Sequence, residues 1–253
     1  MYHAHVLWDC LIVYAALDEK PPFLEETLTK MSGFLESIAH PDGEIPLFGD
    51  SALNEAPPTQ ALLNVTRSLL PRSAVSATRT TVRKEPGAFF EASGFYILGN
   101  KEKGHHMIVK TAPPMPSYQP GHSHADMLSY ELSLNGKRII VDSGVHGYAE
   151  SALRGYCRST LAHNTVQLDT LEQCEWWKVF RIGQRPKAGT PRFEVRPDFI
   201  SLEAAYEHHL GYRHCRCIHY SPSQHYWKVK DTVEVGSGSH EIKSMIHLHP
   251  DIR

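Results

Sequence analysis

The residues best suited to chemistry lie in three short segments between positions 121 and 165. These segments read Gly121-His-Ser-His-Ala-Asp126, Val141-Asp-Ser-Gly144 and Ala162-His-Asn-Thr165. If the first segment is a strand, its two histidines point to the same face, because side chains alternate along a strand. Two imidazoles and a carboxylate form a three-ligand set that suits zinc and leaves one position for water. The segments therefore predict a metal or acid–base site, with surface histidines beside a turn as the simpler alternative.

The overall composition narrows the class of protein. Histidine occurs 17 times among 253 residues, and it is both a common metal ligand and the side chain that titrates near neutral pH. The net charge is -2, so no basic field indicates a nucleic-acid partner. The longest apolar run, residues 11–17, is too short to cross a membrane, and the first residues show no signal-peptide pattern. Five cysteines without regular spacing are expected to be mostly free thiols.

The elements that must position these segments change in type along the chain. Apolar residues recur at helical spacing over 4–17, 23–39 and about 59–70, and a polar segment over 71–87 predicts a linker. The remainder is typical of strands, with no helical pattern between them, which favours an antiparallel β-sandwich. The expected strands cover 89–98, 106–111, 127–134, 138–142, 164–168, 193–205, 212–220, 226–235 and 241–248. We expect an α+β multidomain protein with a helical part at 1–75 and a sandwich at 76–253 that is incomplete at its C-terminus.

The pairing of two expected strands complicates a shared metal site. Asn135-Gly136 predicts a tight hairpin, because a primed turn needs positive φ at both central residues. A regular ladder from that turn places His124 on the face opposite Asp142. A metal shared by these two side chains therefore requires either a β-bulge or irregular entry between His124 and Leu128, or a three-residue turn.

The region from 121 to 165 resembles the heparinase II/III-like polysaccharide lyases. The likeness rests on the three segments above and on Tyr148, Arg154-Gly-Tyr156 and Arg158-Ser-Thr160, with weaker matches at Met1-Tyr-His3, Phe48-Gly-Asp-Ser51 and His247-Leu-His-Pro250. The resemblance implies the C-terminal helices of an (α/α) toroid followed by an antiparallel β-sandwich that carries zinc. It also implies cleavage of acidic, uronate-containing polysaccharides by β-elimination in the periplasm or outside the cell.

The resemblance also assigns roles to individual residues. His124, Asp142 and His163 fall on the zinc ligands, and His122 falls on a histidine that lines the substrate cleft. Tyr2 corresponds to a toroid tyrosine that serves as catalytic acid or base. The other expected site residues are a catalytic tyrosine, Tyr156, and the substrate-binding His3, Tyr148, Arg154, Arg158 and Trp176. Tyr148 is the alternative to Tyr156 as the additional cleft tyrosine.

β-Elimination explains why these residue types are needed. Removal of the C5 proton of a uronate becomes feasible when donors or positive charge neutralise the neighbouring carboxylate. A tyrosine whose pKa is lowered by nearby cations is expected to take this proton, and a tyrosine to return one to the leaving oxygen. His122 is then a carboxylate neutraliser or a base. The arginines attract the anionic chain, and Trp176 either stacks on a sugar ring or packs inside the protein.

Other hypotheses remain open. Members of the family have further toroid helices that this sequence does not match, so we expect a truncated form with weak or absent activity. The alternative function is a non-catalytic carbohydrate-binding or structural sandwich stapled by zinc. A cupin-like metal oxygenase fits less well, because Glu131 lies too far beyond the second histidine of the His-x-His pair. The oligomeric state and the particular polysaccharide stay undetermined at this level.

Overall fold

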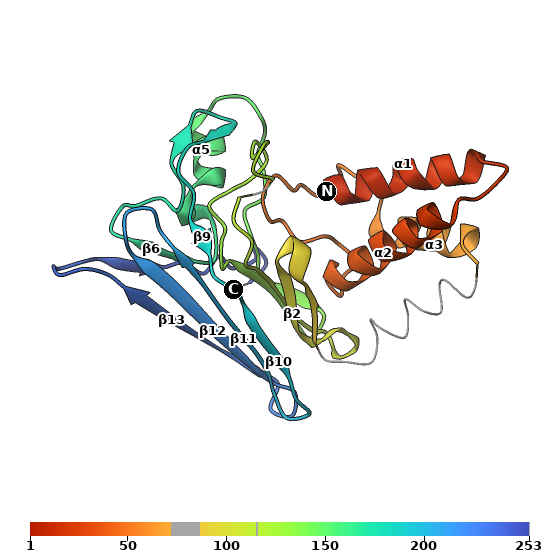
Figure 1. Cartoon of the computed structure of the whole chain (residues 1–253). Helices are drawn as coiled ribbons and strands as arrows, with labels where there is room; N and C mark the ends of the chain where they lie inside the picture. Colours follow the sequence, from red (N-terminus) through yellow and green to blue (C-terminus); the bar gives the residue numbers. More distant parts are fainter. Residues whose placement is uncertain (72–86, 115, 253) are drawn as a thin grey trace.

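A computed structural model describes residues 1–71, 87–114 and 116–252 of the chain. Its elements form three layers: a group of helices, a five-stranded sheet and a second antiparallel sheet (Figure 1). The order of helices first and antiparallel strands second confirms the expected α+β architecture. The expected boundary after residue 75 and most of the expected linker lie outside the described residues.

Three helices packed against one another make the first layer. They are α1 (Tyr2–Ala16), α2 (Pro22–Ile38) and α3 (Thr59–Leu69), each within a few residues of the expected bounds. Pro22 at the start of α2 suits a first-turn position, because the missing N–H has no partner inside a helix there. Leu7, Leu11, Leu28 and Leu62 are fully buried where the three helices meet. The amphipathic spacing that predicted the helices is therefore also what packs them.

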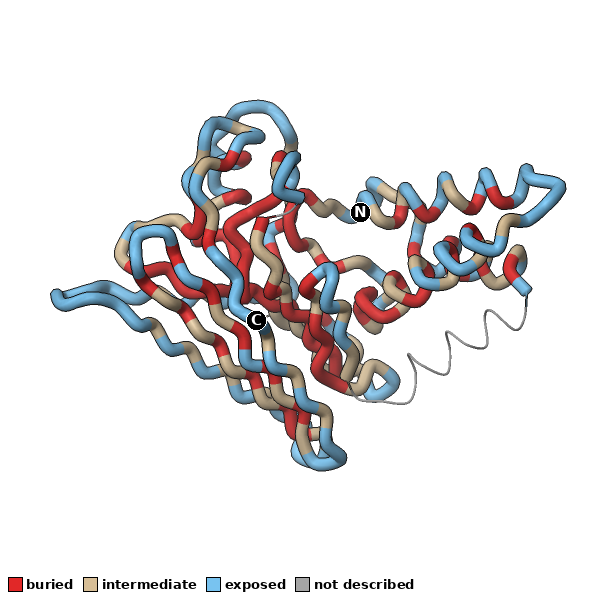
Figure 2. Tube along the Cα trace, in the orientation of Figure 1, coloured by how far each residue is buried: buried red, intermediate tan, exposed pale blue. Residues whose placement is uncertain are grey.

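The middle layer is a sheet in the order β1-β2-β3-β4-β5. Its strands are β1 (Gly87–Phe90), β2 (Phe95–Asn100), β3 (His105–Lys110), β4 (Tyr130–Leu134) and β5 (Lys137–Ile140). One face contributes Leu98 and Met107 to the core shared with the second sheet, while Ile108 on the other face packs against α2. Strands β2 and β3 consequently consist mostly of buried residues, which are red in Figure 2, and their sequences lack the alternation of a strand with one wet face.

The second sheet closes the sandwich. It has the order β10-β11-β12-β13, with β9 (Lys187–Ala188) pairing separately with β11. The main strands are β10 (Arg192–Val195), β11 (Ile200–Glu207), β12 (Arg213–Ser221) and β13 (Tyr226–Glu234). Their inward residues alternate with polar outward residues, as the sequence predicts for a sheet with one wet face.

Three expectations about these elements are wrong. The single strand expected at 89–98 is two strands, since the chain reverses through a 3-10 turn and Gly94, whose φ is 66°. The strand expected at 193–205 is likewise a hairpin, β10 and β11. A helix, α5 (Ala152–Arg158), also interrupts the strands where no helical pattern was expected. At seven residues it is too short for apolar periodicity to reveal it.

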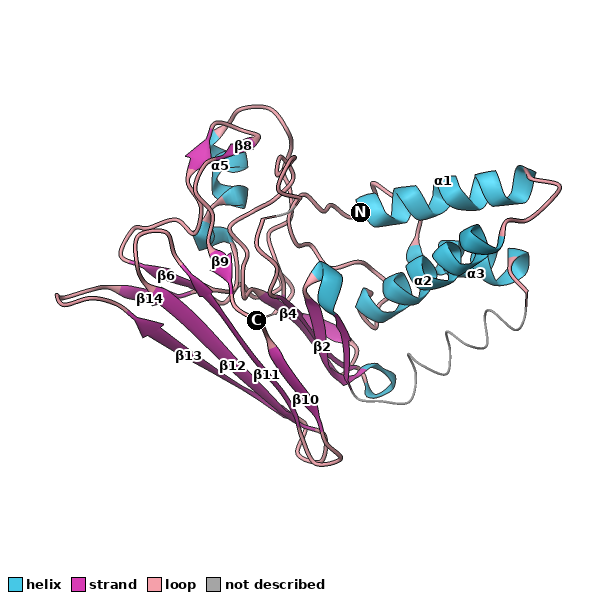
Figure 3. Cartoon of the chain, in the orientation of Figure 1, coloured by secondary structure: helices cyan, strands magenta, loops and turns pink. Residues whose placement is uncertain are grey.

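Small elements complete the region around α5 (Figure 3). Strand β6 (Val166–Leu168) pairs with β14 (Ile242–Ser244), and β7 (Trp176–Trp177) pairs with β8 (Arg181–Ile182). Two further 3-10 turns cover Lys101–Lys103 and Thr160–Ala162. Within the described residues no helix is long and apolar enough to cross a membrane.

The turn and the entry into β4 match the expectations for a shared site. Asn135 and Gly136 have φ values of 52° and 80°, the positive pair of a primed two-residue turn. The β4–β5 register also shifts between Leu132 and Ser133, which lies beyond the interval 124–128 where an irregularity was expected. Leu128 adopts a φ of 60°, so the chain enters β4 irregularly. The regular ladder that would separate His124 from Asp142 is therefore absent.

Candidate active site

Three side chains from distant parts of the sequence meet at the N-terminal end of α1. The Tyr2 hydroxyl lies 2.6 Å from the Tyr148 hydroxyl and 3.3 Å from His122 Nδ1. The rings of Tyr2 and His122 are 4.6 Å apart, and Tyr148 meets His122 edge to face at 5.8 Å. We call Tyr2, His122 and Tyr148 the tyrosine–histidine cluster. It brings together two aromatic hydroxyls and one imidazole on a partly exposed surface.

A tight loop holds His122 in place. The Asp50 N–H donates to the His122 carbonyl at 3.1 Å, and the Gly49 N–H donates to Asp126 at 3.1 Å. Gly49 has a φ of 57°, and a Cβ atom there would lie 3.0 Å from the His122 carbonyl oxygen. Glycine is therefore required at 49 both for the left-handed backbone and for the close approach of the two loops.

Asp50 is the central charged residue of the site, and the sequence did not single it out. Its buried carboxylate accepts hydrogen bonds from His122 Nδ1 at 2.9 Å and from His124 Nε2 at 2.8 Å. Arg154 adds a two-pronged ion pair, with one bond of 2.9 Å from Nη2 and a second from Nη1. The only signal in the sequence was the weak match at Phe48-Gly-Asp-Ser51.

The surroundings shift the pKa values of two of these groups in opposite directions. Burial opposes ionisation of Asp50, but hydrogen bonds from His124, Arg154 and His122 outweigh it and hold its pKa well below the usual range. Burial, followed by the hydrogen bond with Tyr148, raises the pKa of Tyr2. The expectation that cations lower the pKa of the catalytic tyrosine is wrong for Tyr2, since the lowering by Arg154 is the smallest influence. Tyr2 is therefore a protonated hydroxyl at neutral pH.

Two expected site residues lie apart from the cluster. Tyr156 is exposed on α5, and the structure places Tyr148, not Tyr156, beside Tyr2. His3 turns between the helices, where its Nε2 donates to the Met31 carbonyl at 2.9 Å, and burial lowers its pKa. Neither side chain contributes to the arrangement around Tyr2.

The two expected arginines differ in their partners. Arg154 is buried and neutralised by Asp50, and its guanidinium lies 5.5 Å from the Tyr148 ring. Arg158 is also buried, but it donates to the carbonyls of Ser123, Lys178 and Val179. It lies 4.3 Å from the centroid of the half-buried Trp176 ring. Trp176 thus packs against an arginine while part of its ring stays accessible.

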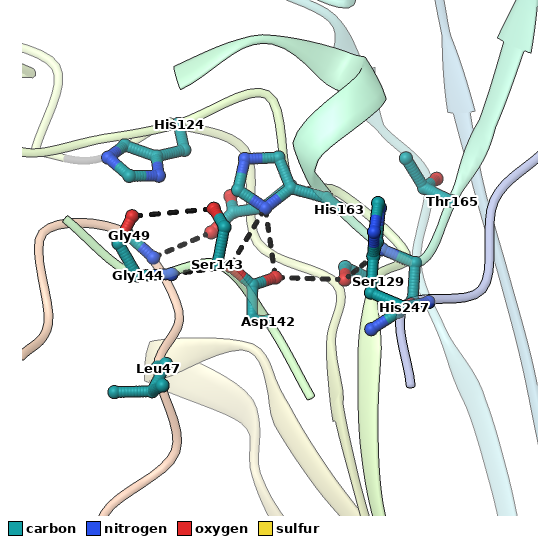
Figure 4. Close-up of polar contacts among 12 residues, drawn as sticks. Leu47, Gly49, His124, Ser129, Asp142, Ser143, Gly144, His163, Thr165 and His247 are labelled. Carbon is teal, nitrogen blue, oxygen red and sulfur yellow. Dashed lines mark hydrogen bonds and ion pairs between the residues drawn. The ribbon is translucent and has the colours of Figure 1, made fainter. Parts of the chain in front are cut away.

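The three predicted zinc ligands gather in one buried cluster (Figure 4). His163 Nδ1 donates to both oxygens of Asp142 at 2.9 Å, and the ring centroids of His124 and His163 are 5.3 Å apart. The hydroxyl of Ser129 also donates to Asp142 at 3.3 Å. We call His124, Asp142 and His163 the histidine–aspartate cluster. It joins the loop before β4, the segment after β5 and the segment before β6.

The donor set of this cluster agrees in part with a metal site. His124 Nδ1 and His163 Nε2 are buried nitrogen atoms without a hydrogen-bond partner, so each has a lone pair or a proton to share. Asp142 accepts a hydrogen bond from His163 Nδ1, so its carboxylate lies beside one of these two imidazoles. In the described part of the chain, no three His, Cys, Asp or Glu side chains are already arranged to hold a metal ion. All five cysteines are free, as expected in the main, and none joins this cluster.

Comparisons with known proteins identify the family. The sequence matches the family described as heparinase II/III-like, C-terminal, over residues 82–253. The chain therefore belongs to the heparinase II/III-like family. It is 29% identical over 178 residues to the heparin-sulfate lyase of Bacteroides stercoris, and 29% identical over 163 residues to that of Pedobacter heparinus. These alignments cover 64% and 60% of the chain, but only 26% and 24% of the relatives.

Solved structures show the same fold. The heparan sulfate lyase HepC from Pedobacter heparinus superposes with a TM-score of 0.76 at 21% identity, covering 99% of this chain and 40% of that one. A heparinase III structure superposes with a TM-score of 0.74 at 22% identity, covering 95% of this chain and 38% of that one. The chain thus spans about two fifths of these structures, and they include its helices as well as its sandwich.

Proposed function

We propose that the protein is a polysaccharide lyase that cleaves an acidic, uronate-containing polysaccharide by β-elimination. Family membership supports the reaction class. The observation that carries the proposal is the Tyr2 hydroxyl, which lies within hydrogen-bond distance of both Tyr148 and His122. The reaction breaks a C5–H bond and the C4–O bond, forms a C4=C5 double bond and protonates the leaving oxygen. It therefore needs one base and one acid in reach of the same sugar.

Tyr2 is suited to the acid role. Its raised pKa keeps the hydroxyl protonated at neutral pH, and its side chain is 42% exposed, so a substrate oxygen can reach it. The Tyr148 hydroxyl at 2.6 Å fixes the orientation of the Tyr2 hydroxyl. A proton passed from Tyr2 to the 4-oxygen lets the leaving group depart as a neutral alcohol.

His122 is suited to the base role. The ionised Asp50 accepts a hydrogen bond from His122 Nδ1, which selects the tautomer with a free lone pair on Nε2. The side chain is 45% exposed, so Nε2 is open to a bound sugar. His122 thus takes the C5 proton, while Asp50 holds the ring in position.

The test is elimination by the wild-type protein and by matched variants. Incubation with heparan sulfate, alginate, hyaluronan and bacterial exopolysaccharides should raise ultraviolet absorbance for one of them, as the new double bond conjugates with the carboxylate. Tyr2→Phe and His122→Ala should each lower the rate at least about 100-fold. Tyr118→Phe, on a side chain that is 88% exposed, serves as the control and should not change it. If the wild-type chain raises the ultraviolet absorbance of none of the four polymer classes, the proposal for this chain is contradicted.

A second measurement separates the acid from the base. A substrate with an activated leaving group, such as a nitrophenol at the 4-oxygen, needs no proton from the enzyme. Tyr2→Phe should regain most of its rate on that substrate, whereas His122→Ala should not. Equal recovery of the two variants would contradict the assigned roles.

We also propose that His124, Asp142 and His163 hold a Zn²⁺ ion. The two unpartnered imidazole nitrogens and the carboxylate form a donor set that zinc prefers. When bound, the ion would tie three segments of the sandwich together. Zinc content measured by elemental analysis should be close to one per chain and should fall in His124→Ala, while the exposed His146→Ala keeps it.

The alternative function is a carbohydrate-binding or structural sandwich stapled by the same metal. The buried position of the histidine–aspartate cluster favours a structural role for that cluster. In this alternative Tyr2→Phe and His122→Ala leave polysaccharide binding unchanged, and no double bond forms.

We further propose a periplasmic or secreted location, since the proposed substrate is a large polymer outside the cytoplasm. Fractionation of the native host tests this location.

A further inference from the structure

A small pocket lies beside α5, next to the tyrosine–histidine cluster. Its volume is about 250 Å³, and its wall includes Glu150, Arg154, Arg158, Trp176 and Lys178. Helix α5 and the β7–β8 ribbon form the top of the molecule together in Figure 3. Three of the five wall residues named are cationic, and the single carboxylate among them, on Glu150, is exposed. We call it the Arg158 pocket.

The wall of this pocket holds hydrogen-bond donors that nothing satisfies. Arg154 Nε, Arg158 Nη2 and Trp176 Nε1 are buried and have no acceptor in the described part of the chain. Guanidinium and indole nitrogens always carry hydrogen and cannot act as acceptors. Across the described residues, these are the three buried nitrogens of that kind without a partner, and all three belong to residues that line the same pocket. Their convergence indicates a missing acceptor.

Arg158 also lacks a counterion among the residues that the structure describes. Its Nε donates to the Ser123 carbonyl at 3.2 Å, and its Nη1 donates to the carbonyls of Lys178 and Val179. Within the described chain no carboxylate lies in ion-pair distance of it, whereas Arg154 is paired with Asp50. Burial, with a smaller influence of Arg154, lowers the pKa of Arg158 to about 10, so the group remains charged at neutral pH. A buried guanidinium without a counterion calls for an anion.

The geometry of the donors favours a tetrahedral anion over a carboxylate. Arg158 has only Nη2 free, so it cannot form the two-pronged fork that suits a planar carboxylate. The free donors come one each from three side chains, on α5 and on β7. An anion with three or four acceptor oxygens can satisfy donors arranged in this way.

We propose that the Arg158 pocket binds a sulfo group of the substrate polysaccharide through Arg154 Nε, Arg158 Nη2 and Trp176 Nε1, with Lys178 at its entrance. The subsite rests on the proposed function for its polymer, and it selects sulfated chains over unsulfated chains of the same sugars. The Arg158 pocket lies close to the tyrosine–histidine cluster, because Arg154 in its wall contacts both Asp50 and the Tyr148 ring. The Lys178 and Glu150 side chains are the exposed members of the pocket wall named above.

The test uses conservative variants, since Arg158 supports three backbone carbonyls and its replacement risks misfolding. Trp176→Phe removes one N–H and keeps an aromatic ring beneath Arg158. Its control, Trp177→Phe, removes an exposed N–H whose acceptor is Glu175. Lys178→Gln removes one charge at the pocket, and Arg181→Gln removes one exposed charge outside it.

Binding is measured by calorimetry with heparan sulfate oligosaccharides, with unsulfated heparosan oligosaccharides of equal length, and with inorganic sulfate. Trp176→Phe should weaken binding of the sulfated oligosaccharide about tenfold, and Lys178→Gln about threefold. Neither should change heparosan binding, and both control variants should behave as the wild type. The subsite would be overturned if the wild type bound the two oligosaccharides with equal affinity, or if it bound inorganic sulfate but neither oligosaccharide. Equal losses of affinity in the variants and their controls would also overturn it.

These outcomes are separate from the fate of the proposed function. Trp176-dependent binding of the sulfated oligosaccharide without any double-bond formation would support the subsite and contradict the lyase. Double-bond formation at equal rates on both polymers, unchanged in Trp176→Phe, would support the lyase and contradict the subsite.

Discussion

Replacement of Asp50 by asparagine tests whether this buried carboxylate organises the site. Asp50 is 3% exposed and Arg154 is 1% exposed, so their ion pair is shielded from water. Asp50→Asn would keep the shape of the side chain but remove the charge that two histidines and Arg154 share. Breaking one partner of a buried pair leaves the other charge uncompensated, at a cost of about 3–5 kcal/mol.

That cost is a large part of the stability of a typical domain, which is about 5–15 kcal/mol. For a chain of this size it corresponds to a fall in Tm of roughly 6–20 °C. Urea unfolding followed by circular dichroism should therefore give Asp50→Asn a clearly lower free energy of unfolding than the wild type. The control is Asp9→Asn on the exposed side of α1, which should change that free energy by less than about 0.5 kcal/mol.

A double-mutant cycle identifies the origin of the loss. Arg154→Met removes the buried charge that Asp50→Asn leaves behind, so the double variant should be more stable than the sum of the single losses implies. The expected coupling energy is about 1–3 kcal/mol. A single-variant loss below about 1 kcal/mol, or strictly additive losses, would refute the reasoning that Asp50 compensates Arg154.

Three further predictions concern stability. Burial lowers the pKa of His40 to about 3, so the unfolded chain takes up a proton near pH 6.5 and the folded chain does not. The contribution of His40 to the free energy of unfolding should therefore fall between pH 6.5 and pH 3, and in urea titrations His40→Gln should lessen the fall by up to about 1.4 kcal/mol per pH unit below pH 4.5, where the raised pKa of its neighbour Glu131 no longer opposes it. If His40→Gln left the pH dependence of the free energy of unfolding unchanged, protonation of His40 would not be its cause. Gly49→Ala should lower the free energy of unfolding in urea by about 1–3 kcal/mol, because position 49 has a positive φ and a Cβ there would meet the His122 carbonyl. The control Gly147→Ala, whose Cβ would lie in open space, should lower it by less than about 0.5 kcal/mol. Equal losses in the two variants would contradict the steric argument. Treatment with a chelator should lower Tm if zinc is bound, and addition of zinc at about 100 times its Kd should raise the free energy of unfolding by about 2.7 kcal/mol. A Tm that stays the same after both treatments would argue against the metal.

Much of the local structure followed from the sequence. The three helices appeared at apolar repeats that also form their packed faces, and Asn135-Gly136 formed the tight turn that its residue types require. Local structure of this kind depends on backbone geometry and on short-range periodicity, which a single sequence displays. The family was visible for the same reason, since its motif residues are close together in the chain.

Other features needed the folded chain. Helix α5 and the breaks at 91–94 and 196–199 are too short to leave a periodic signal. Strands β2 and β3 are covered on both faces, so their apolar runs gave no information about which residues face the helices.

The sequence by itself determined the order of the elements, the hairpin turn and the residues worth examining around His122 and His124. Only the tertiary structure decided that Tyr148 and not Tyr156 meets Tyr2, and that Asp50 joins the two histidines to Arg154. Those contacts join residues 72 to 146 positions apart. They arise from the packing of the helical layer against the sheet, and no local pattern encodes the distance between two such layers. The contacts around α5 likewise leave Arg158 buried without a counterion among the described residues, which is a property of its surroundings and not of its place in the sequence.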